Sequence, residues 1–565
     1  MPYLPKNELA QLVTGLCRTH HISDVVISPG SRNAPLIIGF VNQTEFETFS
    51  VVDERSAAFM ALGMAQQSGK PVALVCTSGS ALLNYYPAVA EAFYSKIPLV
   101  ILSADRPKRL IDVGDGQTIR QENVFENHIL FSANLEEMST GSSKDSFEKN
   151  AALIQEALLI SEEQKGPVHI NVPFDEPLYE LAEGFTIKVP EAEEPVKDSL
   201  LDEIPLEVDE LQKYADIWNS CSKKMVLLGS SFPDEMIQTQ LEHLVKDPSV
   251  LVLTETTSNV YHHKFVNSID KLIIPLSEEE LHDLQPEILL SFGGMVVSKK
   301  IKQFLRKIPP KYHWHADRFN APDTYHCLKH HFAVSPQLFF SQFFFLTRIK
   351  ESGYQKKWLS VKEIRLQKHK LFLDSAVFSD LKVFEIVLKN IPEGSQLQLS
   401  NSSVIRYSQL FDIEPSLQVF CNRGTSGIDG STSTAVGASL RSGKRTVLIT
   451  GDISFLYDSN ALWNNYIRKD FRIILINNSG GGIFRFIPGP KKSTALNYFE
   501  TPHHLNAKPL CALYGMDYRS ALNEEQLKEE LGCFFDRTHK PVLLEIFTPS
   551  GENDLILKKY FNSLI

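Results

Sequence analysis

Two short motifs in the last third of the chain place oxygen-bearing side chains directly after apolar runs. Gly451-Asp452 closes the run RTVLIT, and Asn477-Asn478 closes the next run, RIILI. Side chains at the carboxyl ends of parallel strands face the ligand crevice of an open α/β sheet, so we expect Asp452 and Asn478 to share a site. With the backbone carbonyl of Gly480, they supply the hard oxygen ligands that Mg²⁺ prefers and that phosphates complete. Each motif alone is more typical of a helix cap or a turn, but together they predict a metal and phosphate site.

A further candidate stands in the first third of the chain. Glu54, in the stretch VVDERSAAFMALGMA, lies where a predicted strand passes into an apolar helix. A carboxylate at this position is also favoured simply by the helix dipole. From residue type and position, Glu54 is therefore either a catalytic carboxylate or a helix-terminal charge.

The elements that must position these residues alternate between short β-branched runs and helical stretches. This alternation predicts an α/β fold of doubly wound parallel sheets covered by helices. The two ends of the chain each carry a series of such runs that closes on a Pro-Val strand, PVHINVP in one and PVLLEIF in the other, which indicates a distant duplication of one unit. We expect strands at 24–28, 49–52, 72–76, 99–103 and 168–172 in the first series, and at 396–399, 418–421, 446–450, 473–476 and 542–546 in the second.

The middle of the chain predicts a third, smaller α/β domain, with MVLLGSS, VLVLT, ILLSFGG and YHWHAD as strand candidates. Residues 183–210 are rich in acids and contain three prolines, which is typical of a solvated linker. We therefore expect three domains, at residues 1–182, 211–350 and 351–565, with the acidic linker 183–210 between the first two.

The composition argues against several classes of function. The 565 residues include 57 Lys plus Arg against 68 Asp plus Glu, a net charge of −11, and no basic run, so nucleic acid is not an expected partner. No stretch approaches the about 18 apolar residues of a membrane span, and no leader pattern opens the chain. The seven cysteines are scattered, and the histidines between His313 and His331 fit no zinc spacing. We expect a cytoplasmic protein without a membrane span.

Five longer stretches narrow the interpretation. In chain order they are SPGSRNAPL, TSGSALLNYYPAVAEAFYSKIPLVILSADRP, GDGQTIRQENVF, NRGTSGIDGSTSTAVG and NNSGGGIFRFIPG. Together with Glu54 and the Asp452–Asn478 pair, they resemble the 2-succinyl-5-enolpyruvyl-6-hydroxy-3-cyclohexene-1-carboxylate synthases, thiamine diphosphate-dependent enzymes of menaquinone biosynthesis. The middle domain resembles this family mainly at GGMVVSKK.

The resemblance implies that the first and third domains are related thiamine diphosphate-binding folds. Glu54 would then be catalytic against the pyrimidine ring of the cofactor, and Asp452, Asn478 and Gly480 would hold Mg²⁺ or Mn²⁺. The implied reaction is decarboxylation of 2-oxoglutarate and addition of the resulting carbanion to isochorismate, in a homodimer or homotetramer whose active sites are shared between subunits. The alternatives are another thiamine-dependent 2-oxoacid carboligase or decarboxylase, of the acetolactate-synthase type, and an inactive thiamine-binding scaffold.

The resemblance also assigns residues to the two dicarboxylate substrates, for which arginine forks are well suited. Positions that bind isochorismate are matched by Ser31, Arg32, Arg106 and Gln117, and a basic pair of the middle domain is matched by Lys299 and Lys300. Positions that hold the carboxylate derived from 2-oxoglutarate are matched by Ser402, Arg406 and Arg423, and the two arginines are also candidate catalytic residues. The support of the bent cofactor is matched by Ile428, and apolar walls of the reaction cavity are matched by Ile483 and Phe484.

Overall fold

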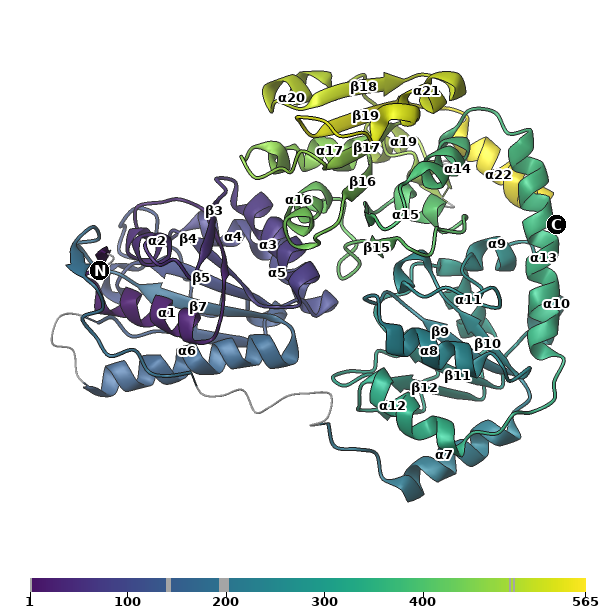
Figure 1. The fold of residues 1–565 in the computed structure, drawn as a ribbon, viewed down its shortest axis with the longest axis horizontal. Helices are drawn as coiled ribbons and strands as arrows, with labels where there is room; N and C mark the ends of the chain where they lie inside the picture. Colours follow the sequence, from purple (N-terminus) through teal and green to yellow (C-terminus); the bar gives the residue numbers. More distant parts are fainter. Residues whose placement is uncertain (1–2, 139–143, 193–202, 487–488, 491–492) are drawn as a thin grey trace.

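The computed structural model describes residues 3–138, 144–192, 203–486, 489–490 and 493–565. The described chain forms three parallel sheets flanked by helices, which confirms the predicted α/β class. Figure 1 shows the first sheet on one side of the molecule and the other two sheets stacked on the other side. Residues 193–202, in the predicted acidic linker, lie outside the described residues.

The first and last sheets have the same strand order. It is β3-β2-β4-β5-β7-β6 in one and β15-β14-β16-β17-β19-β18 in the other, which supports the duplication inferred from the two Pro-Val strands. The first sheet contains β2 (Asp24–Ile27), β3 (Glu47–Ser50), β4 (Val72–Cys76), β5 (Leu99–Asp105), β6 (Phe131–Asn134) and β7 (Pro167–Pro173). The last sheet contains β14 (Gln396–Leu399), β15 (Gln418–Phe420), β16 (Thr446–Gly451), β17 (Arg472–Asn477), β18 (Asp517–Ala521) and β19 (Val542–Phe547).

Helices cover both of these sheets. The first is flanked by α1 (Glu8–Thr19), α2 (Ala34–Val41), α3 (Glu54–Ser68), α4 (Ser80–Asn84), α5 (Tyr86–Ser95) and α6 (Lys144–Gln164). The last is accompanied by α14 (Asp380–Asn390), α15 (Ser403–Ser408), α16 (Ser431–Arg441), α17 (Asp452–Tyr457), α18 (Ile483–Phe486), α19 (Leu496–Glu500), α20 (Lys508–Leu513), α21 (Glu524–Phe534) and α22 (Asn553–Ser563). Among the described helices, none combines the length and the apolar character needed to cross a membrane.

The middle sheet has the order β10-β9-β11-β12-β13. Its strands are β9 (Lys224–Leu228), β10 (Val250–Leu253), β11 (Ile288–Phe292), β12 (Tyr312–Ala316) and β13 (His330–Phe332). Its helices are α7 (Val208–Ser220), α8 (Glu235–Leu244), α9 (Ile269–Ile273), α10 (Glu278–Asp283), α11 (Lys299–Lys307) and α12 (Pro336–Phe343). The long helix α13 (Tyr354–Asp374) runs along the outside of the middle and last sheets (Figure 1).

The strands that the sequence did not predict lie mostly at sheet edges. β6, β13 and β18 each end a sheet, and their residues are partly exposed and largely polar, so they form no apolar run. A small antiparallel pair of β1 (Tyr3–Pro5) and β8 (Leu181–Glu183) also had no signal, because each strand has three residues. The strand expected at 49–52 begins two residues earlier, at Glu47, a start that was not predicted because the polar Glu47 and Thr48 do not form part of an apolar run.

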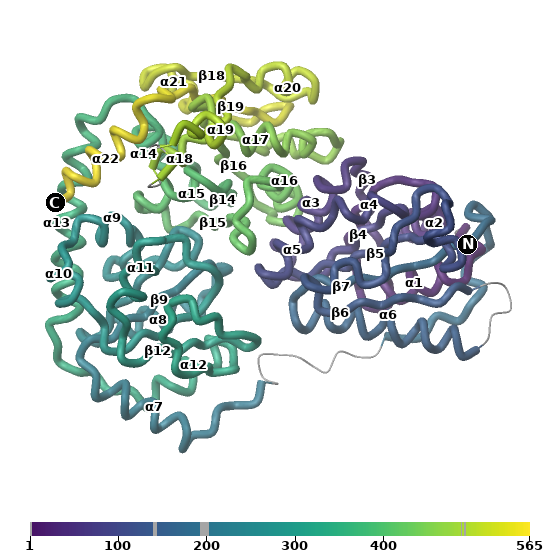
Figure 2. The backbone as a smooth tube through the Cα atoms, turned by 180° about the vertical axis from the view of Figure 1, so that it is seen from behind, coloured from purple at the N-terminus to yellow at the C-terminus, as the bar shows by residue number. Residues whose placement is uncertain are grey.

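The first and last regions meet through helices α3 and α16, which lie side by side in Figures 1 and 2. A Cβ on Gly437 would lie 1.9 Å from the carbonyl oxygen of Met60, so only glycine permits this approach. One buried core continues across the contact and includes Phe59 and Met60 of α3 and Val436 of α16. The packing therefore fixes the start of α3 relative to the strand ends of the last sheet.

Candidate active site

Asp452 and Asn478 lie at neighbouring strand ends of the last sheet. Asp452 begins α17 directly after β16, and Asn478 follows β17, which pairs with β16. The Asp452 carboxylate accepts from the backbone N–H of Ile453 at 2.7 Å and from that of Gly480 at 2.9 Å. Burial raises the pKa of Asp452, although these two donors oppose the rise. The turn after Asn478 is thus tied to the Asp452 carboxylate.

The side-chain amide of Asn478 leaves one atom unpaired. Nδ2 donates to Asp380 Oδ2 at 3.0 Å, whereas Oδ1 is buried and has no hydrogen-bond partner among the described residues. A buried amide oxygen without a partner is costly unless a ligand meets it. A divalent cation is such a ligand, since carboxylate and amide oxygens are its usual partners. The residues at this edge therefore fit the metal ion expected from the sequence.

The glycines after Asn478 form a turn that side chains would obstruct. Gly480 has a φ of +150°, and a Cβ there would lie 2.7 Å from the carbonyl oxygen of Glu500. The same carbonyl accepts from the N–H of Gly481 at 2.7 Å. The close approach of two backbones explains why glycine is required here.

The two expected apolar wall residues follow this turn. Ile483 begins α18, and both Ile483 and Phe484 are half-buried. The ring of Phe484 packs against that of Phe499, with centroids 5.4 Å apart. These side chains form an apolar border beside Asp452, Asn478 and Gly480, which are called the metal edge below.

His503 is a neighbour of the metal edge that sequence reasoning missed. Its Nε2 lies 3.2 Å from Asp452 Oδ2, and its backbone N–H donates to the carbonyl of Ser479 at 3.2 Å. The residue belongs to the loop TPHHLN, which contains no recognisable motif. Only the folded chain brings it to the site.

Glu54 is the first residue of α3 and is half-buried. Its Oε2 accepts from Asn84 Nδ2 at 3.3 Å. On its two sides, Asp53 Oδ2 accepts from Asn460 Nδ2 at 2.7 Å, and the Arg55 guanidinium donates to the carbonyl of Tyr457 at 2.7 Å. Tyr457 ends α17, a helix of six residues that Asp452 begins, so the helix is about 9 Å long. Arg55, the neighbour of Glu54, is therefore tied to the end of the short helix that Asp452 begins.

The loop that carries Ile428 is held by residues of the first and the last sheet regions. The Ile428 carbonyl accepts from the Ser454 hydroxyl at 2.6 Å. The buried carboxylate of Glu91, on α5, accepts from the N–H groups of Gly424 and Thr425 at 2.7 and 2.6 Å. Glu91 is thus a supporting residue that the sequence did not single out.

Arg406 and Arg423 lie close together between the middle and last sheets. Burial is the main cause that lowers the pKa of Arg406, and the neighbouring Arg423 guanidinium acts in the same direction. Arg423 donates to Asn401 Oδ1 at 2.8 Å, and its Nε is buried without a partner among the described residues. Ser402, which precedes α15, has a left-handed φ of +68°. The three positions expected to hold a carboxylate thus belong to one cluster at the strand ends.

The middle region brings a third lysine toward Arg406 and Arg423, besides the expected pair. Lys299 and Lys300, in the first turn of α11, are exposed. Lys302 is partly buried, and burial is the main cause that lowers its pKa. The carboxyl of Glu255 opposes this shift, whereas Arg423 and Arg406 add to it.

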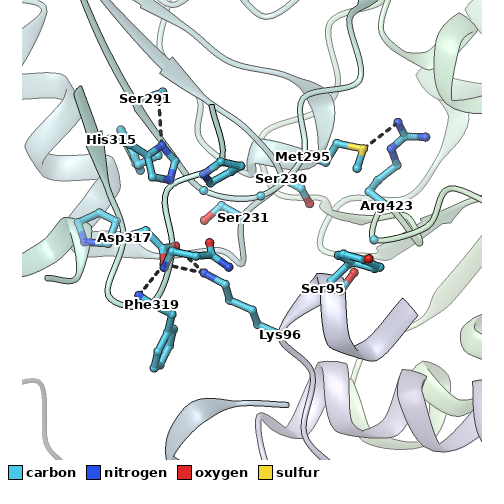
Figure 3. A pocket seen from close by; sticks show the side chains of 18 of the residues that line it. Ser95, Lys96, Ser230, Ser231, Ser291, Met295, His315, Asp317, Phe319 and Arg423 are labelled. Atoms are coloured by element: carbon cyan, nitrogen blue, oxygen red, sulfur yellow. Dashed lines mark hydrogen bonds and ion pairs between the residues drawn. The ribbon is translucent and has the colours of Figure 1, made fainter. Parts of the chain in front are cut away.

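A cavity of about 940 Å³ opens beside these cations. Figure 3 shows Arg423 and Met295 on one side of it and His315 and Asp317 on the other. Lys96 reaches across to Asp317, with distances of 2.7 and 2.6 Å to the two carboxylate oxygens. The positive charge of Lys96 is therefore neutralised, whereas the Arg423 side of the cavity remains cationic.

The predicted isochorismate-binding residues lie at the strand ends of the first sheet. The buried Arg32 donates to the carbonyl of Phe174 at 3.0 Å, and Arg106 Nε donates to that of Gly116 at 2.8 Å. Gln117 follows in the same loop and has a φ of +55°. Ser31 and Gln117 are exposed. These four positions therefore surround one end of the first sheet, as parallel strands require.

The histidines of the middle sheet are structural. His313 and His315 both contact the hydroxyl of Ser291, at 2.8 and 2.9 Å. Burial lowers the pKa of each imidazole to about 4, so both are neutral at physiological pH. Within the described residues, no group of three or more His, Cys, Asp or Glu side chains is arranged to hold a metal ion.

The duplicated sheets, the buried side-chain oxygens at the strand ends of one and the carboxylate at the start of α3 define a thiamine diphosphate-dependent enzyme. Two family profiles match accordingly. "Thiamine pyrophosphate enzyme, N-terminal TPP binding domain" covers residues 7–130, and "Thiamine pyrophosphate enzyme, C-terminal TPP binding domain" covers residues 402–546.

The chain belongs to the 2-succinyl-5-enolpyruvyl-6-hydroxy-3-cyclohexene-1-carboxylate synthase family. It is 53% identical over 561 residues to the synthase of Flavobacterium psychrophilum and 52% identical over 564 residues to that of Flavobacterium johnsoniae. It is also 52% identical over 574 residues to the synthase of Christiangramia forsetii. Each similarity covers 99% of this chain and 99% of the relative.

Proposed function

We propose that this enzyme decarboxylates 2-oxoglutarate and joins the remaining succinyl unit to isochorismate, giving 2-succinyl-5-enolpyruvyl-6-hydroxy-3-cyclohexene-1-carboxylate and CO₂ in menaquinone biosynthesis in the cytoplasm. The observation that carries the proposal is that Arg55, the residue after the proposed acid Glu54, is bonded to the last residue of α17, the helix that begins with the proposed metal ligand Asp452. Thiamine diphosphate, when bound, supplies the electron sink for loss of CO₂.

The metal site that we propose consists of Asp452, the Oδ1 atom of Asn478 and the backbone carbonyl of Gly480. The unpartnered Asn478 oxygen beside a buried carboxylate supports Mg²⁺ there, with Mn²⁺ as a substitute. The ion would neutralise the diphosphate of the cofactor at the ends of β16 and β17. Ile428, whose loop is held by Ser454, would support the cofactor in a bent conformation.

Glu54 would act on the pyrimidine ring of the cofactor by holding a proton at a ring nitrogen. The Asn84 amide donates to one of its carboxylate oxygens, which leaves the other available for this contact. Ile483 and Phe484 would exclude water from the reacting atoms, because their half-buried side chains border the metal edge. In a site with little water, each electrostatic interaction is stronger.

The two substrates would be held by cations from different sheets. Ser31, Arg32, Arg106 and Gln117 of the first region would bind the carboxylates and hydroxyl of isochorismate. Ser402, Arg406 and Arg423 would bind 2-oxoglutarate, and the two arginines would also hold the carboxylate during the reaction. We add Lys302 to this group because its charge is partly buried beside Arg423. We assign the exposed Lys299 and Lys300 to the solvent-facing rim of the substrate site.

The assay with 2-oxoglutarate, isochorismate, Mg²⁺ and thiamine diphosphate tests the reaction. Formation of the cyclohexene carboxylate, with one CO₂ released for each product, is expected. Consumption of pyruvate alone would favour an acetolactate-synthase-type enzyme instead. Binding of the cofactor without turnover of any 2-oxoacid would favour an inactive scaffold.

We further propose a homodimer or homotetramer with active sites shared between subunits. This proposal rests on the family resemblance. Within one chain α3 already lies against α16, so sites built within a single subunit are the alternative. Co-expression of Glu54→Gln and Asp452→Asn chains distinguishes shared sites from sites within one subunit. If the sites are shared, a mixed dimer contains one intact site and regains activity, whereas sites built within one chain would leave every site defective.

A further inference from the structure

Asp380 is a buried carboxylate for which the proposed reaction has no role. It is the first residue of α14 and only 1% exposed. It belongs to none of the motifs that the sequence singled out, yet it contacts the side chain of Asn478, 98 residues away. A charged group so deep in the protein needs strong partners.

Both oxygens of Asp380 are occupied. Oδ2 accepts from Asn478 Nδ2 at 3.0 Å, and Oδ1 accepts from the hydroxyl of Thr548 at 2.6 Å. The backbone N–H of Asp380 donates to Asn553 Oδ1 at 2.9 Å. Thr548, which follows β19, therefore holds one carboxylate oxygen, and Asn553, which begins α22, holds the backbone at the start of α14.

The contact determines how the Asn478 amide is turned. An ionised carboxylate only accepts hydrogen bonds, whereas a side-chain amide donates through nitrogen and accepts through oxygen. Nδ2 of Asn478 must therefore face Asp380, and Oδ1 must face away from it. Gly482 lies against the amide, since a Cβ there would be 3.2 Å from Nδ2. The side chain is thus confined in a single orientation.

We propose that Asp380 is a positioning residue that turns the carbonyl oxygen of Asn478 toward the cation bound by Asp452. This inference rests on the metal site proposed above. The buried Oδ1, unpartnered among the described residues, is what such an orientation leaves for a ligand. Partners behind a metal ligand commonly contribute 10–100-fold to metal affinity, about the size of effect expected here.

Substitution of Asp380 by leucine tests the orientation directly. Leucine has no acceptor, so Asn478 Nδ2 loses its partner and the amide is no longer held in one orientation. We expect the Kd for Mn²⁺, measured by electron paramagnetic resonance with thiamine diphosphate present, to rise by about 10-fold or more.

Two variants supply the matched controls. Asp380→Asn keeps an acceptor for Asn478 Nδ2, because its amide can turn its oxygen to Asn478 and its NH₂ to the Thr548 hydroxyl, which also accepts. We expect its Mn²⁺ affinity, and that of Thr548→Val, which leaves the Asn478 contact intact, to change less than about threefold. A role of Asp380 as a mere buried charge would make Asp380→Asn bind as weakly as Asp380→Leu.

The outcomes separate this inference from the proposed function. If the wild-type enzyme bound no Mn²⁺, the metal site itself would be wrong, and the inference with it. If the wild type bound Mn²⁺ and Asp380→Leu bound it equally well, or if Asp380→Asn bound it as weakly as Asp380→Leu, only the positioning role would be overturned. In a crystal structure of the wild-type holoenzyme, the Asn478 atom on the metal must be the one turned away from Asp380. Metal ligation by Asp380 itself would contradict the proposal whether or not the variants fold.

Discussion

Gly63 of α3 approaches Thr434 of α16 so closely that a Cβ on Gly63 would lie 2.0 Å from the Thr434 carbonyl oxygen. The obstructing atom belongs to a backbone and cannot rotate away. Because Glu54 begins α3 and the loop of Ile428 leads into α16, this contact fixes these two residues relative to each other. The spacing of the two helices thus determines the distance between the proposed acid and the proposed support of the cofactor.

Gly63→Ala is therefore expected to separate α3 from α16. We expect the free energy of unfolding to fall by about 1–3 kcal/mol, as for other overpacked cores, and the affinity for thiamine diphosphate to fall with it. Urea unfolding and cofactor titration by tryptophan fluorescence measure the two effects. Gly532→Ala on the exposed side of α21 is the control, since a Cβ there meets nothing and alanine favours a helix. An unchanged cofactor affinity in Gly63→Ala would show that the contact does not control cofactor binding.

Glu54→Gln is expected to abolish most turnover while the cofactor still binds. The amide keeps the size of the carboxyl and its contact with Asn84, but it cannot exchange a proton with the pyrimidine ring. Loss of a positioned acid–base group typically reduces kcat by about 100-fold or more. Steady-state kinetics and calorimetric titration of thiamine diphosphate check the two halves of this prediction. Glu156→Gln, at an exposed position of α6, should leave both values unchanged, and an active Glu54→Gln enzyme would mean that another group activates the cofactor.

Arg106→Ala is expected to weaken the use of isochorismate. Arg106 Nε donates to the carbonyl of Gly116, in the loop that carries Gln117, and Nη1 lies 3.5 Å from Asp115 Oδ2, so Nη2 remains for a substrate carboxylate. Loss of a charge-assisted hydrogen bond of about 1.5–3 kcal/mol corresponds to a KM for isochorismate that is about 10–100-fold higher. Arg109→Ala removes an exposed guanidinium that is paired with Asp175 and Glu137, and it serves as the control. A KM effect confined to 2-oxoglutarate would reverse our assignment of the two carboxylate sites.

The positions of the strand-end residues could be predicted because their signal is local. Asp452 and Asn478 each follow a continuous apolar run, so the strand and its end are both visible in the sequence. The pairing of β16 with β17 then brings them together, as parallel sheets require. Arg106 was singled out through the family resemblance, and it too directly follows a strand, β5.

The supporting residues could not be predicted because they act across large distances in the chain. Glu91 holds Gly424 and Thr425, 333 and 334 residues away, through a carboxylate that resembles any other acid in an apolar helix. Lys302 was hidden for a different reason. The run SKKIK does not reveal which lysine of a helix turn faces inward, and that depends on how α11 packs on the middle sheet.

Lys302→Met is expected to raise the KM for 2-oxoglutarate. Methionine keeps the length of the side chain but removes the charge beside Arg423, so we expect an increase of about fivefold, equivalent to about 1 kcal/mol. Lys299→Met, at the exposed start of α11, is the matched control and should change KM less than twofold, because charges at the surface are screened. Equal effects of the two substitutions would indicate that the lysines act only through long-range electrostatic attraction of the substrate.

Asp458 is expected to make stability depend on pH. Its buried carboxylate accepts from the N–H and the hydroxyl of Ser433, at 2.7 and 2.8 Å, in the first turns of α16. Burial raises the pKa of Asp458 to about 7, although the Ser433 donors oppose the rise. The folded protein therefore binds a proton more tightly than the unfolded chain, whose carboxyl has a pKa near 3.8.

The sign of the effect follows from this difference. The stabilisation that protonation gives is complete below about pH 4, decreases as the pH rises, and is lost above about pH 7. Asp458→Asn cannot titrate at this position. The free energy of unfolding of the wild type minus that of the variant should therefore fall between about pH 4 and 7, by at most about 1.4 kcal/mol per pH unit. Above about pH 8 this difference should be constant. Urea unfolding of both proteins at a series of pH values measures this difference. A difference that grows with pH would mean that the Ser433 hydrogen bonds outweigh burial and that Asp458 anchors α16 as an anion.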